Sequence, residues 1–159
     1  MTFVIRTYRP GDKDKVWNLH EVALKATGAF LSGEWNNDFK DIEGVYLENS
    51  GEFLVGTIDG EIVAMGAFRK ISDEVAVIKR MRVYPDFQRM GFGQQIYDEL
   101  EKRATAKGFK KFVLDTTIVQ KSAQKFYLKN GFVEIGRKTL PVSFLDSGLE
   151  FIYYEKILT

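Results

Sequence analysis

Short apolar runs and longer helical stripes alternate along the chain, beginning with β-branched and aromatic residues at 3–8 that predict a first strand. Pro10-Gly11-Asp12 interrupts this run. From Asp12 onward, apolar residues recur every three or four positions, which predicts a helix that ends near Gly28. A second helical stripe reaches about Asn49, and its apolar positions are Trp35, Phe39, Ile42 and Tyr46.

The middle of the chain predicts three strands in a row. Apolar runs at 52–58 and 61–71 flank Asp59-Gly60, a strong signal for a β-hairpin. After a turn at 72–74, a long strand of apolar and basic residues runs from Glu74 to Tyr84 and stops at Pro85. In the rest of the chain, helical spacing predicts helices over 92–108 and 120–130. Apolar runs predict strands over 110–117, 132–140 and 149–158. The segment 141–148 is expected to be a loop.

The order of these elements is strand, two helices, three strands, helix, strand, helix and two strands. Such a mixed order indicates an α+β fold, with one mostly antiparallel sheet of about seven strands and helices on both faces. No internal repeat, linker or low-complexity segment interrupts the order, and 159 residues suit one domain better than two. We therefore expect a single domain over 1–159.

Composition narrows the classes of function. A net charge of +1 is far less basic than a nucleic-acid reader usually shows, so no nucleic-acid partner is expected. No apolar run approaches the roughly 20 residues of a membrane helix, and the N-terminal segment lacks the pattern of a signal peptide, so no membrane partner is expected. The absence of cysteine excludes disulfides and thiolate catalysis and fits the cytoplasm. With His20 as the single histidine, no metal site is expected.

Two glycines, Gly91 and Gly93, stand at the predicted junction between the long strand and the following helix. Glycine permits positive φ and opens the backbone to a ligand, and a first helical turn offers unpaired N–H donors. The junction therefore suits an anion such as phosphate, to which Arg89 adds a positive charge. The known nucleotide loops do not fit, because Gly93 is followed by two glutamines and the third glycine position is Ile96. On the glycines alone, a mere tight turn is an equal alternative.

Two blocks of the sequence resemble the GCN5-related N-acetyltransferase (GNAT) superfamily. The family's motif A consists of the end of an apolar strand, the pattern Arg/Gln-x-x-Gly-x-Gly/Ala and a helix. The first block is similar to it, because Val83-Tyr84-Pro85 ends the strand and the run from Gln88 to Gly93 follows. The order of elements from Phe3 to Leu158 also matches, so the resemblance covers nearly the whole chain. The second block is similar to motif B, and its matching residues are Ala123, Phe126, Tyr127, Gly131 and Phe132.

The resemblance implies an enzyme that moves an acetyl group from acetyl-coenzyme A (acetyl-CoA) to a primary amine of a small molecule or peptide. It implies a sheet splayed between its fourth and fifth strands, with the pantetheine arm paired near Met81 and Val83. The amide of Met81 or Arg82 would polarise the thioester carbonyl. Gln120 stands where many members have an asparagine that contacts the arm. The pyrophosphate would rest on backbone amides of the glycine loop, namely Gln88, Arg89, Met90, Gly91, Phe92, Gly93 and Gln94.

For the chemistry, the resemblance points to Tyr127 as general acid toward the CoA thiolate, because a phenol with a pKa of about 10 is protonated at neutral pH. From spacing alone, Tyr127 would be a core aromatic. The general base is less defined. Some members carry a glutamate on the motif A strand, where this chain offers Glu74 only at the start, so Glu74 is the candidate base. A water relay is the alternative, as are three carboxylates near the first two helices, Glu34, Asp38 and Asp41.

Other residues leave choices open. We expect His20 in the core or at the surface and Trp35 in the core. Strand alternation places Lys79 on the face opposite Arg80 and Arg82, so these cations would not form one patch. An alternative function is a non-catalytic acyl-CoA sensor or interaction module, because no base is obvious. The chain would be a monomer or homodimer, and an acceptor pocket or dimer contact would involve Phe30, Leu31, Phe144 and Leu145.

Overall fold

Seven strands form one sheet in the order β1-β2-β3-β4-β5-β7-β6. The computed structural model describes residues 2–142 and 145–159. The strands are β1 (Phe3–Thr7), β2 (Glu52–Ile58), β3 (Glu61–Lys70), β4 (Val75–Val83), β5 (Lys111–Thr117), β6 (Val133–Val142) and β7 (Leu145–Ile157). The α-helices are α1 (Lys13–Lys25), α2 (Ile42–Val45), α3 (Phe92–Ala106) and α4 (Lys121–Lys129). Short 3₁₀ helices are η1 (Pro10–Asp12), η2 (Gly33–Lys40), η3 (Leu47–Asn49) and η4 (Pro85–Phe87).

All neighbouring strands are antiparallel except β4 and β5, which are parallel. The α+β fold with a mostly antiparallel sheet is therefore confirmed. The hairpin between β2 and β3 turns at Asp59-Gly60, where both residues have positive φ, as the sequence predicted.

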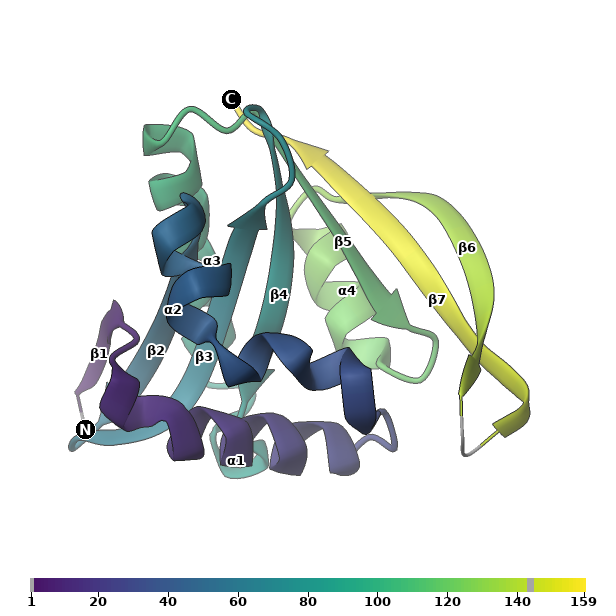
Figure 1. The fold of residues 1–159 in the computed structure, drawn as a ribbon, viewed down its shortest axis with the longest axis horizontal. Coiled ribbons are helices and arrows are strands. Elements are labelled where there is room, and N and C mark those ends of the chain that lie inside the picture. Colours follow the sequence, from purple (N-terminus) through teal and green to yellow (C-terminus); the bar gives the residue numbers. More distant parts are fainter. Residues whose placement is uncertain (1, 143–144) are drawn as a thin grey trace.

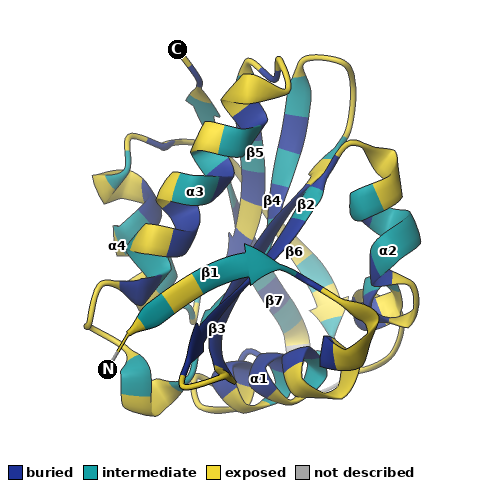
Figure 2. Ribbon diagram, turned by 90° about the vertical axis from the view of Figure 1, so that its left-hand side faces the viewer, coloured by how far each residue is buried: buried dark blue, intermediate teal, exposed yellow. Residues whose placement is uncertain are grey.

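Helices cover both faces of the sheet, and Figure 2 shows α3 and α4 separated from α1 and α2 by the strands. On the first face, Ile96 of α3 packs into one core with Phe112 of β5. On the second face, Leu19 of α1 and Phe39 of η2 pack into another core with Met65 of β3. Burial of these apolar side chains on both faces accounts for the layered architecture.

Strands β4 and β5 pair only at their beginnings, where residues 75–77 lie beside 111–113. Beyond that point the two strands diverge, which Figure 1 shows as a widening gap in the sheet. The splay between the fourth and fifth strands is therefore confirmed. It leaves the second half of β4 with an edge that β5 does not cover.

The second predicted helix is broken into three pieces, η2, α2 and η3, which corrects the prediction of one continuous helix over this region. The break between η2 and α2 lies at Asp41, whose backbone has φ −151° and ψ 69° and whose carboxylate accepts the Gly44 N–H to cap α2. Phe39, Ile42 and Tyr46 enter the core as the apolar stripe predicts. Trp35 does not, and its side chain is 38% exposed.

The predicted loop at 141–148 is mostly strand, because β6 continues to Val142 and β7 begins at Leu145. Pro141 is tolerated because the register between β6 and β7 shifts between Leu140 and Val142, so that Pro141 has no partner in the ladder and needs no N–H. Phe144 lies outside the described residues. In the part of the chain that the structure describes, no helix combines the length and apolarity needed to cross a bilayer.

Candidate active site

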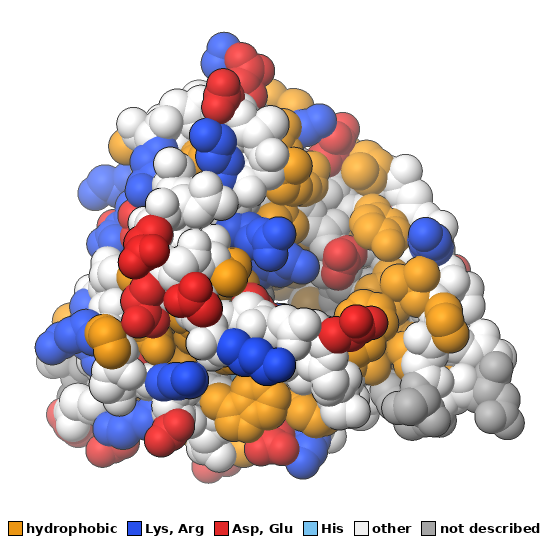
Figure 3. Space-filling model, in the orientation of Figure 1, with side chains coloured by type: hydrophobic (Ala, Val, Ile, Leu, Met, Phe, Trp, Pro, Cys, Tyr) orange, Lys and Arg blue, Asp and Glu red, His pale blue; other side chains and the backbone are white. Residues whose placement is uncertain are grey.

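A cleft of about 560 Å³ opens where β4 and β5 diverge. It reaches from the loop before α3 on one face of the sheet to the end of α1 and the segment before α2 on the other. Figure 3 shows the hollow on the α1 side, with Lys and Arg side chains gathered at its centre. The residues expected to bind CoA that line the cleft are Met81, Arg82, Val83, Gln88, Arg89, Gly91, Phe92, Gly93, Gln94, Gln120 and Tyr127.

Met90 is the exception among the residues expected to bind CoA. It does not line the cleft, and its side chain is 46% exposed. Its backbone still belongs to the loop that precedes α3. The structure therefore leaves no role there for the methionine side chain.

The loop before α3 has the geometry of an anion site. Gly91 is the N-cap of α3 with φ 84°, and Arg89 also has a positive φ of 63°. A left-handed residue followed by helical residues turns successive N–H groups toward one point, which forms a concave anion site. Within the described residues, the amides of 89–94 donate to no carbonyl or side chain. The partial positive charge of the helix N-terminus adds to this field.

Gly93 has no conformational reason to be glycine. Its φ is not positive, and a Cβ there would meet only the Cγ2 of Val83 at 3.5 Å, an ordinary contact. Gly91 differs, because its left-handed φ disfavours any other residue. A ligand that lies on the backbone at Gly93 would explain that glycine, since a methyl group would fill the space above the amides.

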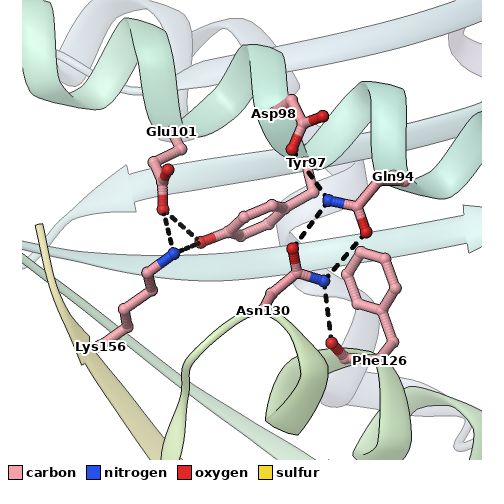
Figure 4. A network of polar contacts seen from close by, with 7 residues as sticks. All are labelled: Gln94, Tyr97, Asp98, Glu101, Phe126, Asn130 and Lys156. Carbon is pink, nitrogen blue, oxygen red and sulfur yellow. Dashed lines mark hydrogen bonds and ion pairs between the residues drawn. The ribbon is translucent and has the colours of Figure 1, made fainter.

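The side chain of Gln94 is held within the protein. Its amide donates to Asp98 at 2.8 Å and to Asn130 at 2.7 Å, and it accepts from Asn130 at 3.1 Å. Figure 4 shows this network joining the first turns of α3 to the end of α4. Farther along α3, Glu101 binds Lys156 of β7 at 2.6 Å, so the helix is also tied to the sheet. Only the backbone N–H of Gln94 is therefore available to an anion.

Two carbonyl oxygens on the uncovered edge of β4 are occupied by side chains instead of a strand. The Met81 oxygen accepts from Nη1 of Arg82 at 2.8 Å, and the Val83 oxygen accepts from Nε2 of Gln88 at 3.0 Å. An extended chain with amide N–H groups could take both positions, as a strand added to a sheet edge does.

A β-bulge re-aims the side chains of β4. Arg80, with φ 60°, and Met81 together oppose the single residue Gly66 of β3. A Cβ on Gly66 would collide with Sδ of Met81 and lie 2.7 Å from Cγ2 of Ile96, so any larger residue there would force these core side chains to shift. The bulge also brings the cations of the strand together. Lys79 pairs with Ala67 and Arg82 with Met65, both of the α1-side core, while Arg80 lies over Phe39.

All three cations therefore face α1, and the prediction that Lys79 faces away from Arg80 and Arg82 is wrong. Simple alternation fails because the bulge inserts an extra residue between them.

Tyr127 reaches the cleft from α4. Burial raises the pKa of its phenol, and the negative charge of Asp115 raises it further. The positive charge of Arg82 lowers it, but the net pKa lies above the ordinary value. The phenol therefore keeps its proton at neutral pH. Among the described side chains, none hydrogen-bonds to its hydroxyl, which leaves that group free for a ligand. Gln120 lies nearby with its Oε1 fixed by the N–H of Thr117 at 3.1 Å, so only its Nε2 is available.

The model of the Acetyltransferase (GNAT) family matches residues 16–132, well over half of the chain. The chain belongs to the GNAT acetyltransferase family. The resemblance of the two sequence blocks is thus confirmed, and members of this family use acetyl-CoA.

Solved GNAT structures share the fold. A GNAT acetyltransferase from Staphylococcus aureus Mu50 is 23% identical with a TM-score of 0.86, covering 99% of this chain and 100% of that one. An acetyltransferase from Streptococcus agalactiae is 24% identical with a TM-score of 0.85, covering 98% of both chains. YncA from Salmonella typhimurium, a putative acetyltransferase solved with its cofactor acetyl-CoA, is 14% identical with a TM-score of 0.82, covering 100% and 95%.

None of the four carboxylates that were candidates for the general base lines the cleft. Glu74 is exposed and pairs with Lys110 at 3.5 Å beside the closed end of the splay. It lies seven residues before Met81, roughly 20 Å along a strand. Asp38 is bound by Arg80 and Tyr46. The remaining two, Glu34 and Asp41, do not line the cleft either.

The sequence interpretation missed Asp115, the one carboxylate among the described residues that lines the cleft. Its neighbours Phe112 and Leu114 on β5 pack into the α3-side core, so alternation points Asp115 toward the α1 side. The side chain is exposed and forms no ion pair within the described part of the chain. A charged residue directly after the apolar run Phe112–Leu114, within the same strand, was the signal that could have found it.

The α1 side of the cleft is built from His20, Trp35 and their neighbours. His20 is fully buried, which corrects the surface alternative, and its Nε2 lies 2.9 Å from Oδ1 of Asn36. Trp35 stacks on Phe151 of β7, with ring centroids 5.5 Å apart and planes 6° from parallel. Leu31 also lines this part of the cleft. The arrangement forms a half-apolar chamber next to the basic residues of β4.

The described residues contain no candidate metal site. Across residues 2–142 and 145–159, no three His, Asp or Glu side chains are grouped to hold an ion.

Proposed function

We propose that this GNAT protein transfers the acetyl group of acetyl-CoA to a primary amine by direct attack of the amine on the thioester. The observation that supports the proposal is that the free amides before α3, the uncovered edge of β4 and Tyr127 all open into one cleft. The acceptor would enter from the α1 side, where His20 and Trp35 line the chamber.

The residues present fit the cosubstrate. The amides from Arg89 to Gln94 and the charge of Arg89 would hold the pyrophosphate, and Gly93 leaves room for it. The pantetheine amides would replace the side chains of Arg82 and Gln88 at the carbonyl oxygens of β4. An amide N–H of Met81 or Arg82 would polarise the thioester carbonyl.

In the chemical step, the amine nitrogen forms a bond to the acetyl carbon and the carbon–sulfur bond breaks. We assign Asp115 as the group that accepts the proton of the ammonium, since it lines the cleft with a free carboxylate. Tyr127 would donate its proton to the departing thiolate, and the second proton lost from the nitrogen as the amide forms would restore the phenol. Because burial keeps this phenol protonated, it is ready to act as the acid at neutral pH.

The experiment is thiol release from acetyl-CoA across a panel of amines, measured for the native chain and for Tyr127→Phe. Turnover of at least one amine that falls sharply in the variant is expected. Tight CoA binding without turnover of any amine would instead favour the alternative of a non-catalytic acyl-CoA sensor. Absence of CoA binding would refute both functions. A cytoplasmic location stays a prediction from the sequence.

A further inference from the structure

Arg82 carries a positive charge into the α1 side of the cleft, and no carboxylate of the described residues forms an ion pair with it. Its Nη1 donates to the Met81 carbonyl oxygen, and its buried Nε has no hydrogen-bond partner in the described part of the chain. Arg80, two residues earlier, is different. Its guanidinium binds both oxygens of Asp38 and the carbonyl oxygen of Trp35. The cluster therefore has one satisfied arginine and one that lacks an anion.

His20 presents a second unmatched atom in the same cleft. Asn36 donates from Nδ2 to the carbonyl oxygen of Leu31 at 2.6 Å, and a carbonyl oxygen can only accept. Oδ1 of Asn36 therefore faces His20, and the Nε2 of the ring must carry the hydrogen. Its Nδ1 is then a buried acceptor, and no donor reaches it among the described residues.

The local charges favour an incoming anion. Burial and the neighbouring charge of Arg80 lower the pKa of Arg82 to about 10. Burial and both arginines lower the pKa of His20 to about 3, so its ring is neutral at pH 7. A buried cation without a partner is costly, and a bound carboxylate would offset that cost through charge-assisted hydrogen bonds.

Arg82 and His20 need different hydrogen-bonding partners, and this difference restricts the chemical class of the ligand. Arg82 offers a donor and needs an anion, whereas Nδ1 of His20 needs a donor. A carboxylate next to an amino group supplies both within one small molecule. The apolar part of the lining consists of Ala23, Leu24, Ala29, Leu31, Trp35 and Phe151, and further polar side chains of the cleft include Thr27, Asn36 and Asp115.

We propose that the acceptor is a small amine that carries a carboxylate beside its amino group, with Arg82 binding the carboxylate, His20 accepting a hydrogen bond from the amino group, and an apolar side chain facing Trp35. This inference deepens the proposed acetyltransferase function and rests on it. The class it names is that of apolar α-amino acids. A peptide acceptor would place a neutral amide where the carboxylate lies.

Binding tests the site without relying on turnover. Calorimetry on the CoA-bound protein compares N-acetyl-L-leucine with N-isopentylacetamide, which differ only in the carboxylate. We expect the carboxylate to strengthen binding by about tenfold or more, the range of a charge-assisted hydrogen bond. Arg82→Gln should remove this difference, whereas Lys79→Gln, which removes a charge from the same face, should keep most of it. Equal binding of the two compounds to the native chain would overturn the proposal.

The affinity of Arg82→Gln for CoA and its melting temperature check that the variant is folded and holds the cosubstrate. If it does not fold, Arg82→Lys keeps the charge but loses the planar fork, and it should retain only part of the preference. An undiminished preference for the carboxylate compound in a folded Arg82→Gln, or in Arg82→Lys, would contradict the assignment.

Turnover separates this inference from the broader function. The native chain should acetylate L-leucine about tenfold or more efficiently, in kcat/KM, than isopentylamine or L-leucinamide. Equal rates with all three would leave the acetyltransferase function standing and overturn the carboxylate site. Preferred acetylation of a peptide amine would overturn it as well. Selective binding of N-acetyl-L-leucine with no turnover of any amine would support the site and refute the function.

Discussion

Arg80 Nε lies 2.9 Å from Oδ2 of Asp38, and the second contact of this forked pair, from Nη2 to Oδ1, is 2.5 Å long. The pair joins the bulge of β4 to η2. Arg80 also donates to the carbonyl oxygen of Trp35 at 2.7 Å, and its guanidinium carbon lies 4.9 Å from the ring centre of Phe39. The segment that covers the α1 side of the cleft is thereby fixed to the strand that forms its wall.

Asp38→Asn should lower the free energy of unfolding by about 3 kcal/mol, because it leaves the charge of Arg80 without a partner in a largely buried site. The two side chains are only 10% and 13% exposed, so solvent screens them little. Urea unfolding at pH 7 measures the loss. Glu21→Gln is the control, since it breaks the more exposed pair with Lys25 and should cost well under about 1 kcal/mol. Equal losses in the two variants would contradict the assignment.

The contribution of Asp38 should disappear in acid. Burial raises the pKa of Asp38, but hydrogen bonds from Arg80 and Tyr46 and the charge of Arg80 outweigh it, so the net pKa is lowered. A carboxyl with a lowered pKa in the folded state stabilises the protein above its unfolded value of about 3.9 and loses this effect as pH falls through the folded value. The stability difference between native chain and Asp38→Asn should therefore be full at pH 6 to 7 and shrink below about pH 4. A difference that does not vary with pH would show that Asp38 acts by packing alone.

Local patterns in the sequence predicted the features that depend on neighbouring residues. Asp59-Gly60 predicted the hairpin because a two-residue turn of this kind needs positive φ at both positions. Gly91 and Gly93 predicted an anion loop because a strand end and a helix start were recognisable on either side. The resemblance of the two blocks to the GNAT family then supplied the splay between the fourth and fifth strands.

Features that depend on distant contacts were missed. The bulge at Arg80 forms opposite Gly66, and only a glycine in the middle of a strand hinted at it. That bulge turns Arg80 toward Asp38, so a carboxylate considered as a base became the partner of an arginine. The splay of β5 from β4 was expected, but Asp115 could be placed at the cleft only once Phe112 and Leu114 were seen to pack into the α3-side core, which fixes the face of β5. Strand alternation gives the face of a residue but not which strand lies beside it.

Gly93→Ala should weaken CoA binding by about tenfold or more, because its methyl group would occupy the space above the amides that we assign to the pyrophosphate. The fold should tolerate it, since the new Cβ meets only Val83 at 3.5 Å and alanine favours the helix by up to about 1 kcal/mol. Calorimetry with CoA and a thermal melt give the two readings. Gly11→Ala, also in open space but outside the cleft, is the matched control. Undiminished CoA affinity in Gly93→Ala would refute the assignment of the loop.

Tyr127→Phe should lower kcat about 100-fold while leaving the affinity for CoA nearly unchanged, because it removes the proton donor and little else. Steady-state kinetics with the best amine of the panel, together with CoA calorimetry, separate the two effects. Tyr154→Phe is the control, since Tyr154 is buried beside Tyr127 with ring centroids 6.5 Å apart but does not line the cleft. A similar loss of kcat in both variants would indicate a packing effect and remove Tyr127 from the chemistry.

Asp115→Asn tests the proposed base. At neutral pH it should lower kcat/KM about 100-fold, because amines with a pKa of about 10 arrive protonated and the amide cannot accept the proton. The deficit should shrink as pH rises toward 9 or 10, where a growing fraction of the amine is already neutral. The measurement is the pH profile of kcat/KM for native chain and variant.

Glu74→Gln is the comparison variant, since that carboxylate pairs with Lys110 away from the cleft. If Glu74→Gln shows the pH-dependent deficit and Asp115→Asn does not, the candidate from the sequence is right and the assignment of Asp115 is wrong. A deficit in Asp115→Asn that is the same at every pH would mean that the carboxylate positions the acceptor and transfers no proton.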